Sequence, residues 1–483
     1  MANYLDGLLG HAARRPGAPA LSLPDRTLTH AEFAASLAGV SAGLASRGVP
    51  AGGVVAVAVR GQAACLRAIL GTILGGRVAL PIDPAAVPAD LDRLLAQSGA
   101  TAILADGREA LPPGRPVIAL GELPAVADPA AVRHAGGDHW AQIVVSSGTT
   151  GPSKAAPASH VQMLRRTRIL EPLLGIGPDD RYLPLIDLAY ALGRHSAVRV
   201  LDVGGAVVLR PLPATVPQLL ALLRAERITY LSLTPTHVRA VLDGMDGEAE
   251  PALPAMRALS VSGSALPLAD RVDVRRRLTP GLHISYGSNE MGFATHAGPA
   301  ELDLAPASVG RALPGIRIEI VDDARAAVAV ATIGEIRVAG AQMQDAYLGG
   351  DASGHHDGWF HPGDTGWLDA HGLLHLAGRT DDRINFGGNK VYPFEVEAVL
   401  RTHPAVADCA VFGVPSRLHQ EVVAAAVVLA AAATTAELRE HCRAHLARPK
   451  IPALFLRLDR LPRNATGKVL VRQLRADLAQ HTD

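Results

Sequence analysis

Short runs of apolar and β-branched residues recur along the first half of the chain, and each run ends in small or polar residues. These runs cover residues 54–60, 142–151, 228–236, 258–267 and 282–290. Segments with helical spacing of apolar positions, such as 216–227 and 237–245, lie between several of them. Apolar strands that alternate with amphipathic helices predict an α/β fold, with parallel-rich sheets covered by helices. Because ligands of such sheets bind beyond the carboxyl ends of the strands, we expect the chemistry in the polar loops there.

The pattern changes after about residue 330. A strand-like segment, 333–340, leads into the turn-rich stretches 357–364 and 373–390. The rest predicts a small α+β domain in which a helix (393–403) is followed by two strands (409–415 and 422–430) and a second helix (434–447). Charge density rises and the apolar pattern stops near Arg379–Asp381, which predicts one domain over 1–380 and a second over 381–483.

Composition excludes several classes of protein. The 483 residues carry 46 Lys+Arg and 46 Asp+Glu, so there is no electrostatic reason to bind nucleic acid or an anionic membrane. Cys65, Cys409 and Cys442 have no CxxC spacing, which argues against a disulfide framework or a structural zinc site. We see no signal peptide, and the longest apolar stretch, 422–433, is too short to span a bilayer. We therefore expect a soluble, cytoplasmic protein.

Residues 146–154, SSGTTGPSK, follow a predicted strand and are the first candidate for phosphate chemistry. Glycines and small hydroxyl residues leave backbone N–H groups free to bind phosphate oxygens, and Lys154 adds a positive charge. The segment is not a Walker loop, because Ala155 follows the lysine where that motif needs Ser or Thr. A flexible surface loop is the plainer interpretation of the nonapeptide alone, but its position after a buried strand favours phosphate binding.

This loop resembles the phosphate loop of the adenylate-forming enzymes, which comprise acyl-CoA synthetases, nonribosomal peptide synthetase adenylation domains and luciferases. Further segments resemble motifs of this family in the family's order: LTHAEF (28–33), GGRVALPIDP (75–84), YGSNE (286–290), GEI (334–336), DGWFHPGD (357–364), GRTDD (378–382) and NATGK (464–468). One such match is weak, but this many in order, over nearly the whole chain, is strong.

The resemblance implies a standalone ATP-dependent, AMP-forming ligase. In the family reaction a carboxylate attacks the α-phosphate of ATP, giving an acyl adenylate and pyrophosphate. Charge builds on phosphate oxygens in the transition state, so positive groups and Mg²⁺ are needed there. The acyl group would then pass to CoA, to a separate carrier protein or to an amine.

The resemblance also implies roles for single residues. Lys154, Glu290 and Lys468 would be catalytic: Lys154 along the β- and γ-phosphates, Glu290 on Mg²⁺, and Lys468 between the carboxylate and the α-phosphate. Thr149 would assist at the metal. The other nucleotide-binding residues would be Ser146, Ser147, Gly148, Thr150, Gly151, Gly263, Ser264, Ala265, Tyr286, Gly287, Ser288, Asn289, Asp364 and Arg379.

Within that set, Tyr286 would stack on adenine, with residues 263–265 on the other side. Asp364 would accept both ribose hydroxyls, with Arg379 beside it. Asp381 would be the hinge about which a mobile C-terminal lid carrying Lys468 rotates, and the cleft between the domains would be the active site. Plainer alternatives are a turn for Asp364, a solvated Lys468 and simple core packing for Tyr286.

Histidines at 355, 356, 361, 371 and 375 could suggest a transition-metal site, but they lack a spacing such as HExxH, so we expect none. The family's "YGxTE" has Asn289 in place of Thr here. Asn289 still offers an amide donor to a phosphate.

The substrate is suggested by Asp187, which stands where acyl-CoA and aryl-CoA relatives commonly have a histidine. Amino-acid-activating relatives have an Asp near this region that pairs with the substrate's ammonium group. A buried carboxylate needs a partner, so we hypothesise an amino acid or aminoaryl acid as substrate. The alternative is that Asp187 pairs with Arg194. Other candidate pocket walls, placed only by their proximity to motifs, are Tyr190, His237, Met291 and Phe293.

Other functions remain open. An unusual acid such as nitrite could be adenylated for attack by an arylamine. A non-catalytic nucleotide-binding homologue would be expected to lack Lys468, Glu290 or Asp364, and all three are present. A P-loop kinase or ATPase is disfavoured by the failed Walker spacing.

Overall fold

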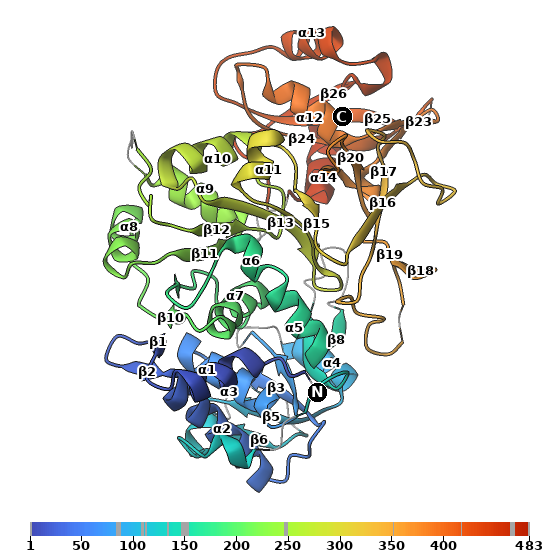
Figure 1. Ribbon diagram of the computed structural model, residues 1–483. Helices are drawn as coiled ribbons and strands as arrows, with labels where there is room; N and C mark the ends of the chain where they lie inside the picture. Colours follow the sequence, from blue (N-terminus) through green and yellow to red (C-terminus); the bar gives the residue numbers. More distant parts are fainter. Residues whose placement is uncertain are drawn as a thin grey trace. The chain divides into compact units, whose positions relative to one another are not determined.

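A computed structural model describes most of the chain (Figure 1). The described residues are 2–83, 88–107, 111, 114–132, 135–145, 154–245, 250–350, 352–416, 418–463 and 469–481. By packing, the chain forms two compact units. Unit 1 comprises Met1–Pro306, Ala312–Arg317 and Ala339–Gly358, and unit 2 comprises Ala307–Arg311, Ile318–Val338 and Trp359–Asp483.

A six-stranded sheet in unit 1 has the order β6-β5-β3-β4-β7-β8. Its strands are β3 (Val54–Ala58), β4 (Val78–Pro81), β5 (Ala100–Ala105), β6 (Val117–Ala119), β7 (Trp140–Val145) and β8 (Ala155–Ser159), with helices α3 (Gln62–Leu74) and α4 (Pro88–Ser98). All neighbours are parallel except β7 and β8. Every residue of β3 and β4 is buried, as expected for parallel strands covered on both faces.

A nine-stranded sheet has the order β15-β14-β13-β12-β11-β9-β10-β1-β2. Its strands are β1 (Pro19–Ser22), β2 (Thr27–Thr29), β9 (Arg181–Tyr182), β10 (Ala206–Val208), β11 (Tyr230–Leu233), β12 (Ala258–Val261), β13 (Leu282–Ser288), β14 (Gly292–Ala297) and β15 (Arg311–Ala312). Parallel pairing joins the strands from β13 to β1, and β13–β14 and β1–β2 are antiparallel hairpins.

The accompanying helices are α1 (Asp6–Arg14), α2 (His30–Ser46), α5 (His160–Arg168), α6 (Glu171–Leu174), α7 (Ala191–Asp202), α8 (Val216–Ala225), α9 (Pro235–Asp243), α10 (Leu268–Asp273) and α11 (Pro299–Leu304). Each of the five apolar runs coincides with a strand, namely β3, β7, β11, β12 and β13, and the two helical segments are α8 and α9. The predicted parallel-rich α/β fold is confirmed.

A further six-stranded sheet lies mostly in unit 2, in the order β18-β19-β17-β20-β21, with β16 paired to β17. Its strands are β16 (Arg317–Val321), β17 (Gly334–Ala339), β18 (His355–His356), β19 (Trp359–Phe360), β20 (Asp364–Leu368) and β21 (Leu374–Arg379).

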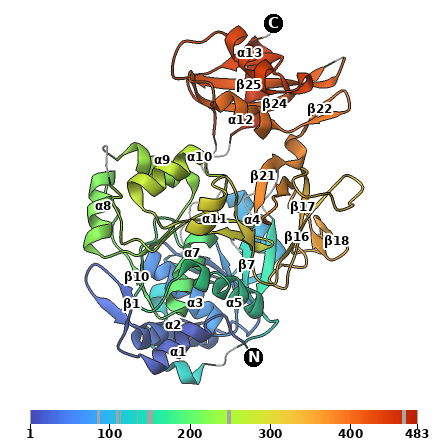
Figure 2. The same ribbon diagram turned by 45° about the horizontal axis from the view of Figure 1, so that its top comes forward.

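A five-stranded sheet in unit 2 has the order β23-β22-β25-β24, with β26 paired to β25 (Figure 2). Its strands are β22 (Ile384–Phe386), β23 (Asn389–Val391), β24 (Val406–Ser416), β25 (Gln420–Leu429) and β26 (Leu454–Arg457), and its helices are α12 (Pro393–Arg401), α13 (Thr435–His445) and α14 (Val471–His481). The expected helix–strand–strand–helix order after residue 393 is therefore present. The predicted boundary between residues 380 and 381 is the expected hinge between two domains, and it stays a prediction.

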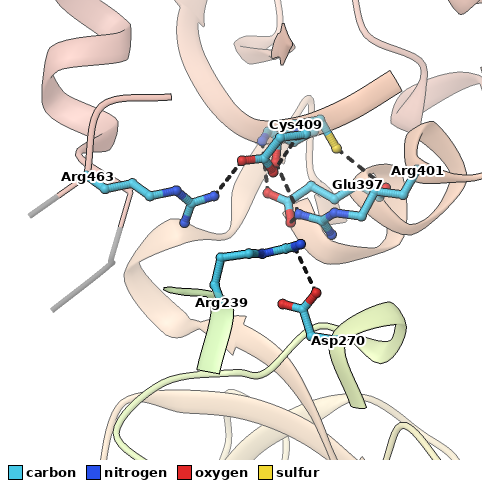
Figure 3. A network of polar contacts seen from close by, with 8 residues as sticks. Arg239, Asp270, Glu397, Arg401, Cys409 and Arg463 are labelled. Carbon is cyan, nitrogen blue, oxygen red and sulfur yellow. Dashed lines mark hydrogen bonds and ion pairs between the residues drawn. The ribbon is translucent and has the colours of Figure 1, made fainter. Parts of the chain in front are cut away.

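Side chains of α12 bind backbone groups of β24 (Figure 3). Glu397 Oε1 accepts a 2.9 Å hydrogen bond from Val411 N, and Arg401 donates to Cys409 O at 3.1 Å and to Glu397 Oε2 at 3.2 Å. Burial raises the pKa of Glu397.

Among the described residues, no helix combines the length and apolar character needed to cross a membrane.

Candidate active site

The predicted phosphate loop begins where β7 ends. Strand β7 stops at Val145, and Val145 is the register partner of Ala155 at the start of β8. The structure therefore fixes both ends of the loop side by side. Residues Ser146, Ser147, Gly148, Thr149, Thr150 and Gly151 lie outside the described residues, and so does Lys468.

Lys154 and Glu290 contact the same tyrosine. The hydroxyl of Tyr347 donates a 2.7 Å hydrogen bond to Glu290 Oε1, and Lys154 Nζ lies 4.6 Å from the centre of the Tyr347 ring. Lys154 Nζ also donates to Ser353 Oγ at 2.6 Å. Two residues predicted to act on the phosphates and the metal are thus brought together. Sequence reasoning missed Tyr347, because a tyrosine in a Gly-rich turn carries no distinguishing pattern.

Tyr347 lies on an irregular segment, residues 341–348, which we call the strap. Its backbone carbonyls bind side chains of α5 and its neighbourhood: Ala341 O accepts from Arg165 at 3.1 Å, Met343 O from Gln162, and Gln344 O contacts His355 Nε2 at 2.7 Å. These carbonyls have no hydrogen-bond partner in a sheet or helix, so side chains of α5 and His355 supply the hydrogen bonds instead. The strap is therefore fixed along its length.

Arg166 connects the strap to the turn that carries Glu290. Its guanidinium donates to the carbonyls of Asn289 at 2.9 Å, Glu290 at 2.8 Å and Gln342 at 2.9 Å. The side chain is buried, and burial lowers its pKa to about 10, so it stays charged near neutral pH. Sequence reasoning missed Arg166 as well, because an arginine in a helix with several basic residues is normally expected on the solvent-exposed face.

The YGSNE segment ends β13. Tyr286 is buried opposite Thr295, and Gly287 and Ser288 complete the strand. The side chain of Asn289 donates from Nδ2 to Val145 O at 3.0 Å. We expected this amide to serve a phosphate, but one of its two N–H groups binds the end of β7 instead.

The loop Gly263, Ser264 and Ala265 follows β12 and is exposed. Since β12 and β13 are parallel neighbours, this loop and the YGSNE turn lie at the same edge of the sheet. Gly263 has a φ of 97°, which favours glycine at this position. The adenine-binding roles of these residues stay predictions.

The premise that Asp187 is buried is wrong. Asp187 is exposed, and its Oδ1 accepts a 2.8 Å hydrogen bond from Ala189 N in a local turn. Within the described part of the chain, Arg194 donates to the carbonyls of Leu188 at 2.9 Å and Ala189 at 2.6 Å, rather than to the Asp187 carboxylate. Asp187 is therefore neither a buried carboxylate nor the ion-pair partner of Arg194 in the described part of the chain.

Asp187 lines a cavity of about 260 Å³ at the carboxyl ends of β3 and β4, whose lining residues are Val59, Arg60, Gly61, Asp83, Asp187, Ala189 and Tyr190. Tyr190 Oη donates to Asp83 Oδ2 at 2.7 Å, and this bond together with burial raises the pKa of Tyr190 to about 12. Because β4 and β7 are parallel neighbours, the cavity lies at the sheet edge where the phosphate loop begins.

The other predicted pocket walls lie outside this cavity. Met291 is buried, at 1% exposure. His237 Nδ1 is 2.7 Å from Thr234 Oγ1, and burial lowers the pKa of His237. The carbonyl of Phe293 accepts a 2.8 Å hydrogen bond from Gln342 Nε2, which places Phe293 beside the strap.

In unit 2, Asp364 and Arg379 stand opposite each other on β20 and β21. Arg379 Nη1 is 2.9 Å from Asp364 Oδ1 and donates to Pro362 O at 2.7 Å. Asp381 is exposed in the turn Thr380–Asp382. The ribose and hinge roles stay predictions.

Two of the histidines pair with carboxylates: His361 Nδ1 with Glu335 at 3.1 Å, and His375 Nε2 with Asp369 at 3.0 Å. His375 also stacks on Trp367. These contacts account for both rings by packing and hydrogen bonding within unit 2.

Comparison with known proteins identifies the family of the chain. The AMP-binding enzyme family matches residues 9–348, and the AMP-binding enzyme C-terminal domain matches residues 395–468. The 2-succinylbenzoate–CoA ligase of Bacillus subtilis is 28% identical over an aligned length of 477 residues, and the alignment covers 97% of each chain. A 3-[(3aS,4S,7aS)-7a-methyl-1,5-dioxo-octahydro-1H-inden-4-yl]propanoyl:CoA ligase of Rhodococcus jostii is 31% identical over 351 residues, 70% of this chain and 65% of that relative.

A solved structure of the o-succinylbenzoate CoA synthetase from Bacillus subtilis, in complex with ATP and magnesium ion, superposes with a TM-score of 0.83 and 27% identity. The superposition covers 98% of this chain and 99% of the Bacillus subtilis chain. The fold and the family match therefore indicate an AMP-forming ligase. The chain belongs to the AMP-binding enzyme family, and the resemblance found in the sequence motifs is confirmed.

Proposed function

We propose that this protein uses ATP to activate a carboxylic acid as an acyl adenylate and then transfers the acyl group to CoA. A carboxylate oxygen of the acid attacks the α-phosphorus, the bond to the β-phosphate oxygen breaks, and pyrophosphate leaves. The thiol of CoA then attacks the acyl carbon, gives up its proton, and AMP leaves. The observation that carries the proposal is the contact of Lys154 and Glu290 with one tyrosine beside the end of β7.

The residues present fit Mg²⁺ and ATP. Glu290 supplies a half-buried carboxylate, which is the ligand type that Mg²⁺ prefers, and Thr149 is its predicted companion. The metal would neutralise phosphate charge. Lys154 is exposed at the end of the phosphate loop, so its ammonium group can bind phosphate oxygens. Asp364 would accept the ribose hydroxyls, and Lys468 would stabilise charge on the α-phosphate.

We further propose that the acid carries an amino group. Asp187 and Asp83 both line the cavity at the ends of β3 and β4, and Tyr190 donates to Asp83 there. An ammonium group placed among these acceptors would form charge-assisted hydrogen bonds. Because Asp187 is exposed, the amino group would be recognised by the shared acidic cavity and not by one buried carboxylate.

A second candidate is an acid with another carboxylate, such as the 2-succinylbenzoate named for the Bacillus subtilis relative. It is favoured by Arg60, which lines the same cavity. A guanidinium recognises a carboxylate in a bidentate geometry, so Arg60 would hold the distal carboxylate while the other is activated.

Substrate-dependent ATP–pyrophosphate exchange tests both candidates. The panel contains amino acids, aminobenzoic acids, the matching benzoic acids, 2-succinylbenzoate, fatty acids, and nitrite with an arylamine. The proposal expects exchange with an aminated acid at least tenfold above its des-amino partner. Asp187→Asn should remove most of this selectivity, and Arg60→Met is the matched control.

The other outcomes are equally informative. Exchange with 2-succinylbenzoate that is lost in Arg60→Met would select the second candidate. Exchange with nitrite alone would replace carboxylic acids as the substrate class, and ATP binding without any exchange would favour a non-catalytic homologue. Acceptor identity follows from AMP release on adding CoA, a carrier protein or an amine.

A further inference from the structure

The strap joins the two residues that the proposed function places on the phosphates and the metal. Gln344 N donates to the carbonyl of Glu290 at 2.9 Å, and Leu348 N donates to the carbonyl of Ala155 at 2.8 Å. Ala155 is the residue directly after Lys154. The strap backbone therefore bridges the turn that carries Glu290 and the strand that follows Lys154.

Tyr347 lies between these two backbone bonds and repeats the bridge with its side chain. Its hydroxyl donates to Glu290 Oε1, and its ring faces the Lys154 ammonium group. A hydroxyl donor on one carboxylate oxygen fixes the direction of the whole carboxylate. An aromatic face below an ammonium group attracts it without removing its charge or its hydrogen-bond donors.

Arg166 anchors the same arrangement from α5. It donates to the Glu290 carbonyl and to the Gln342 carbonyl of the strap with one buried guanidinium. The strap and the Glu290 turn are thus held at three places, by Gln344, Tyr347 and Arg166. A loop that served only as a surface connection would leave such carbonyls to water.

We propose that Tyr347 is a positioning residue that sets the Glu290 carboxylate for Mg²⁺ and the Lys154 ammonium for the phosphates. This inference rests on the proposed function. The two halves of the side chain have separate tasks, because the hydroxyl acts on Glu290 and the ring acts on Lys154. A variant that removes only the hydroxyl should therefore affect the metal, and one that removes the ring should affect the phosphates as well.

Two substitutions separate these tasks. Tyr347→Phe should raise the Mg²⁺ concentration for half-maximal pyrophosphate exchange about tenfold, a typical effect of losing one hydrogen bond to a charged group. Its KM for ATP at saturating Mg²⁺ should stay within about twofold of the unmodified protein. Tyr347→Leu should show the same Mg²⁺ shift and also raise the KM for ATP about tenfold.

Calorimetric binding of ATP, with and without Mg²⁺, gives a readout that needs no turnover. At a Mg²⁺ concentration that half-saturates the unmodified protein, Tyr347→Phe should lose most of the Mg²⁺-dependent part of the ATP affinity and keep the Mg²⁺-independent part. Glu290→Gln should reproduce this pattern, and adding Tyr347→Phe to Glu290→Gln should cause little further change, because both act on one interaction.

Tyr230→Phe is the structural control. It removes a buried hydroxyl that bonds Ser196 and Arg199, both at 3.1 Å, far along the chain from the strap. It should lower the melting temperature without shifting the Mg²⁺ dependence. An unchanged Mg²⁺ dependence in Tyr347→Phe, with an unmodified protein that exchanges pyrophosphate, would overturn this inference alone. An unmodified protein that binds no ATP would overturn the proposed function.

Discussion

Asn289 Nδ2 donates a 3.0 Å hydrogen bond to the carbonyl oxygen of Val145, so the turn after β13 is tied to the last residue of β7. The two strands belong to different sheets. Because the predicted phosphate loop starts at the next residue, this bond fixes the starting point of the loop relative to Glu290. The Asn in place of the family's Thr has a structural task here.

Asn289→Thr, the substitution toward the family motif, tests this link. Threonine is too short to repeat the amide contact, so we expect the KM for ATP to rise about threefold to tenfold, the effect of one hydrogen bond of about 1 kcal/mol. The measurement is the ATP dependence of pyrophosphate exchange. Asn385→Thr, at an exposed position of β22, is the matched control. Equal KM values for Asn289→Thr and the unmodified protein would contradict the role.

Arg166→Met should be strongly destabilising. The substitution removes the donor of the Asn289 and Gln342 carbonyls and leaves the Glu290 carbonyl with only its bond from Gln344 N, and each unsatisfied buried group costs about 1–3 kcal/mol. We expect the free energy of unfolding of unit 1 to fall by about 3 kcal/mol or more in urea denaturation.

The neighbouring Arg165→Met is the control for that experiment. Arg165 is exposed and donates to a single carbonyl, that of Ala341 at 3.1 Å. Its loss should cost less than about 1 kcal/mol, in line with an exposed interaction. Similar losses of unfolding free energy in the two variants would show that the hydrogen bonds of Arg166 stabilise the fold no more than that of Arg165.

A buried histidine pair predicts acid sensitivity. His283 Nδ1 is 3.0 Å from His296 Nε2, and His296 Nδ1 is 3.1 Å from Ser285 Oγ. Burial lowers the pKa of His283 to about 4 and that of His296 to about 3, from an ordinary value of 6.5. The unfolded chain therefore takes up these protons first, and the free energy of unfolding falls as the pH drops from about 6.5 to about 4.

The pH dependence of urea denaturation measures this loss. His296→Gln removes one of the two titrating groups, so its free energy of unfolding should change less steeply between pH 6.5 and pH 4. His371→Gln, an exposed position, should keep the slope of the unmodified protein. A slope that His296→Gln leaves unchanged would mean that other groups take up the protons.

Much of this fold could be predicted from the sequence, and the exceptions have physical reasons. Strands β3, β11 and β12 are apolar over most of their length, so composition and spacing locate them directly. The strap has no such period, because its carbonyls bind side chains of α5 instead of a neighbouring strand. Tyr347 and Arg166 act through those contacts, which have no regular spacing in the sequence, so the hydrophobic pattern could not predict their roles.

Asp187 illustrates the opposite error. Its motif position suggested a buried carboxylate in need of a charged partner, but the side chain is exposed and a turn N–H donates to it. Burial depends on the packing around a loop, which residue type alone does not specify. The acidic cavity became visible only when Asp83, more than a hundred residues earlier in the chain, was placed beside Tyr190.

Asp364 offers a test of nucleotide recognition in unit 2. Its carboxylate is paired with Arg379 at 2.9 Å, and the Asp364 side chain is 21% exposed, so it is oriented but open to a ligand. If Asp364 accepts the ribose hydroxyls, Asp364→Ala should raise the KM for ATP at least tenfold. The unmodified protein should prefer ATP over 2′-deoxy-ATP, and the variant should lose this preference.

Asp369→Ala is the matched control, because Asp369 pairs with His375 in the same part of the sheet. It should keep both the KM for ATP and the preference for the 2′-hydroxyl. A preference for ATP that survives in Asp364→Ala would mean that another group reads the ribose. The Asp364–Arg379 pair would then act only as a cross-strand contact between β20 and β21, worth about 1 kcal/mol or less.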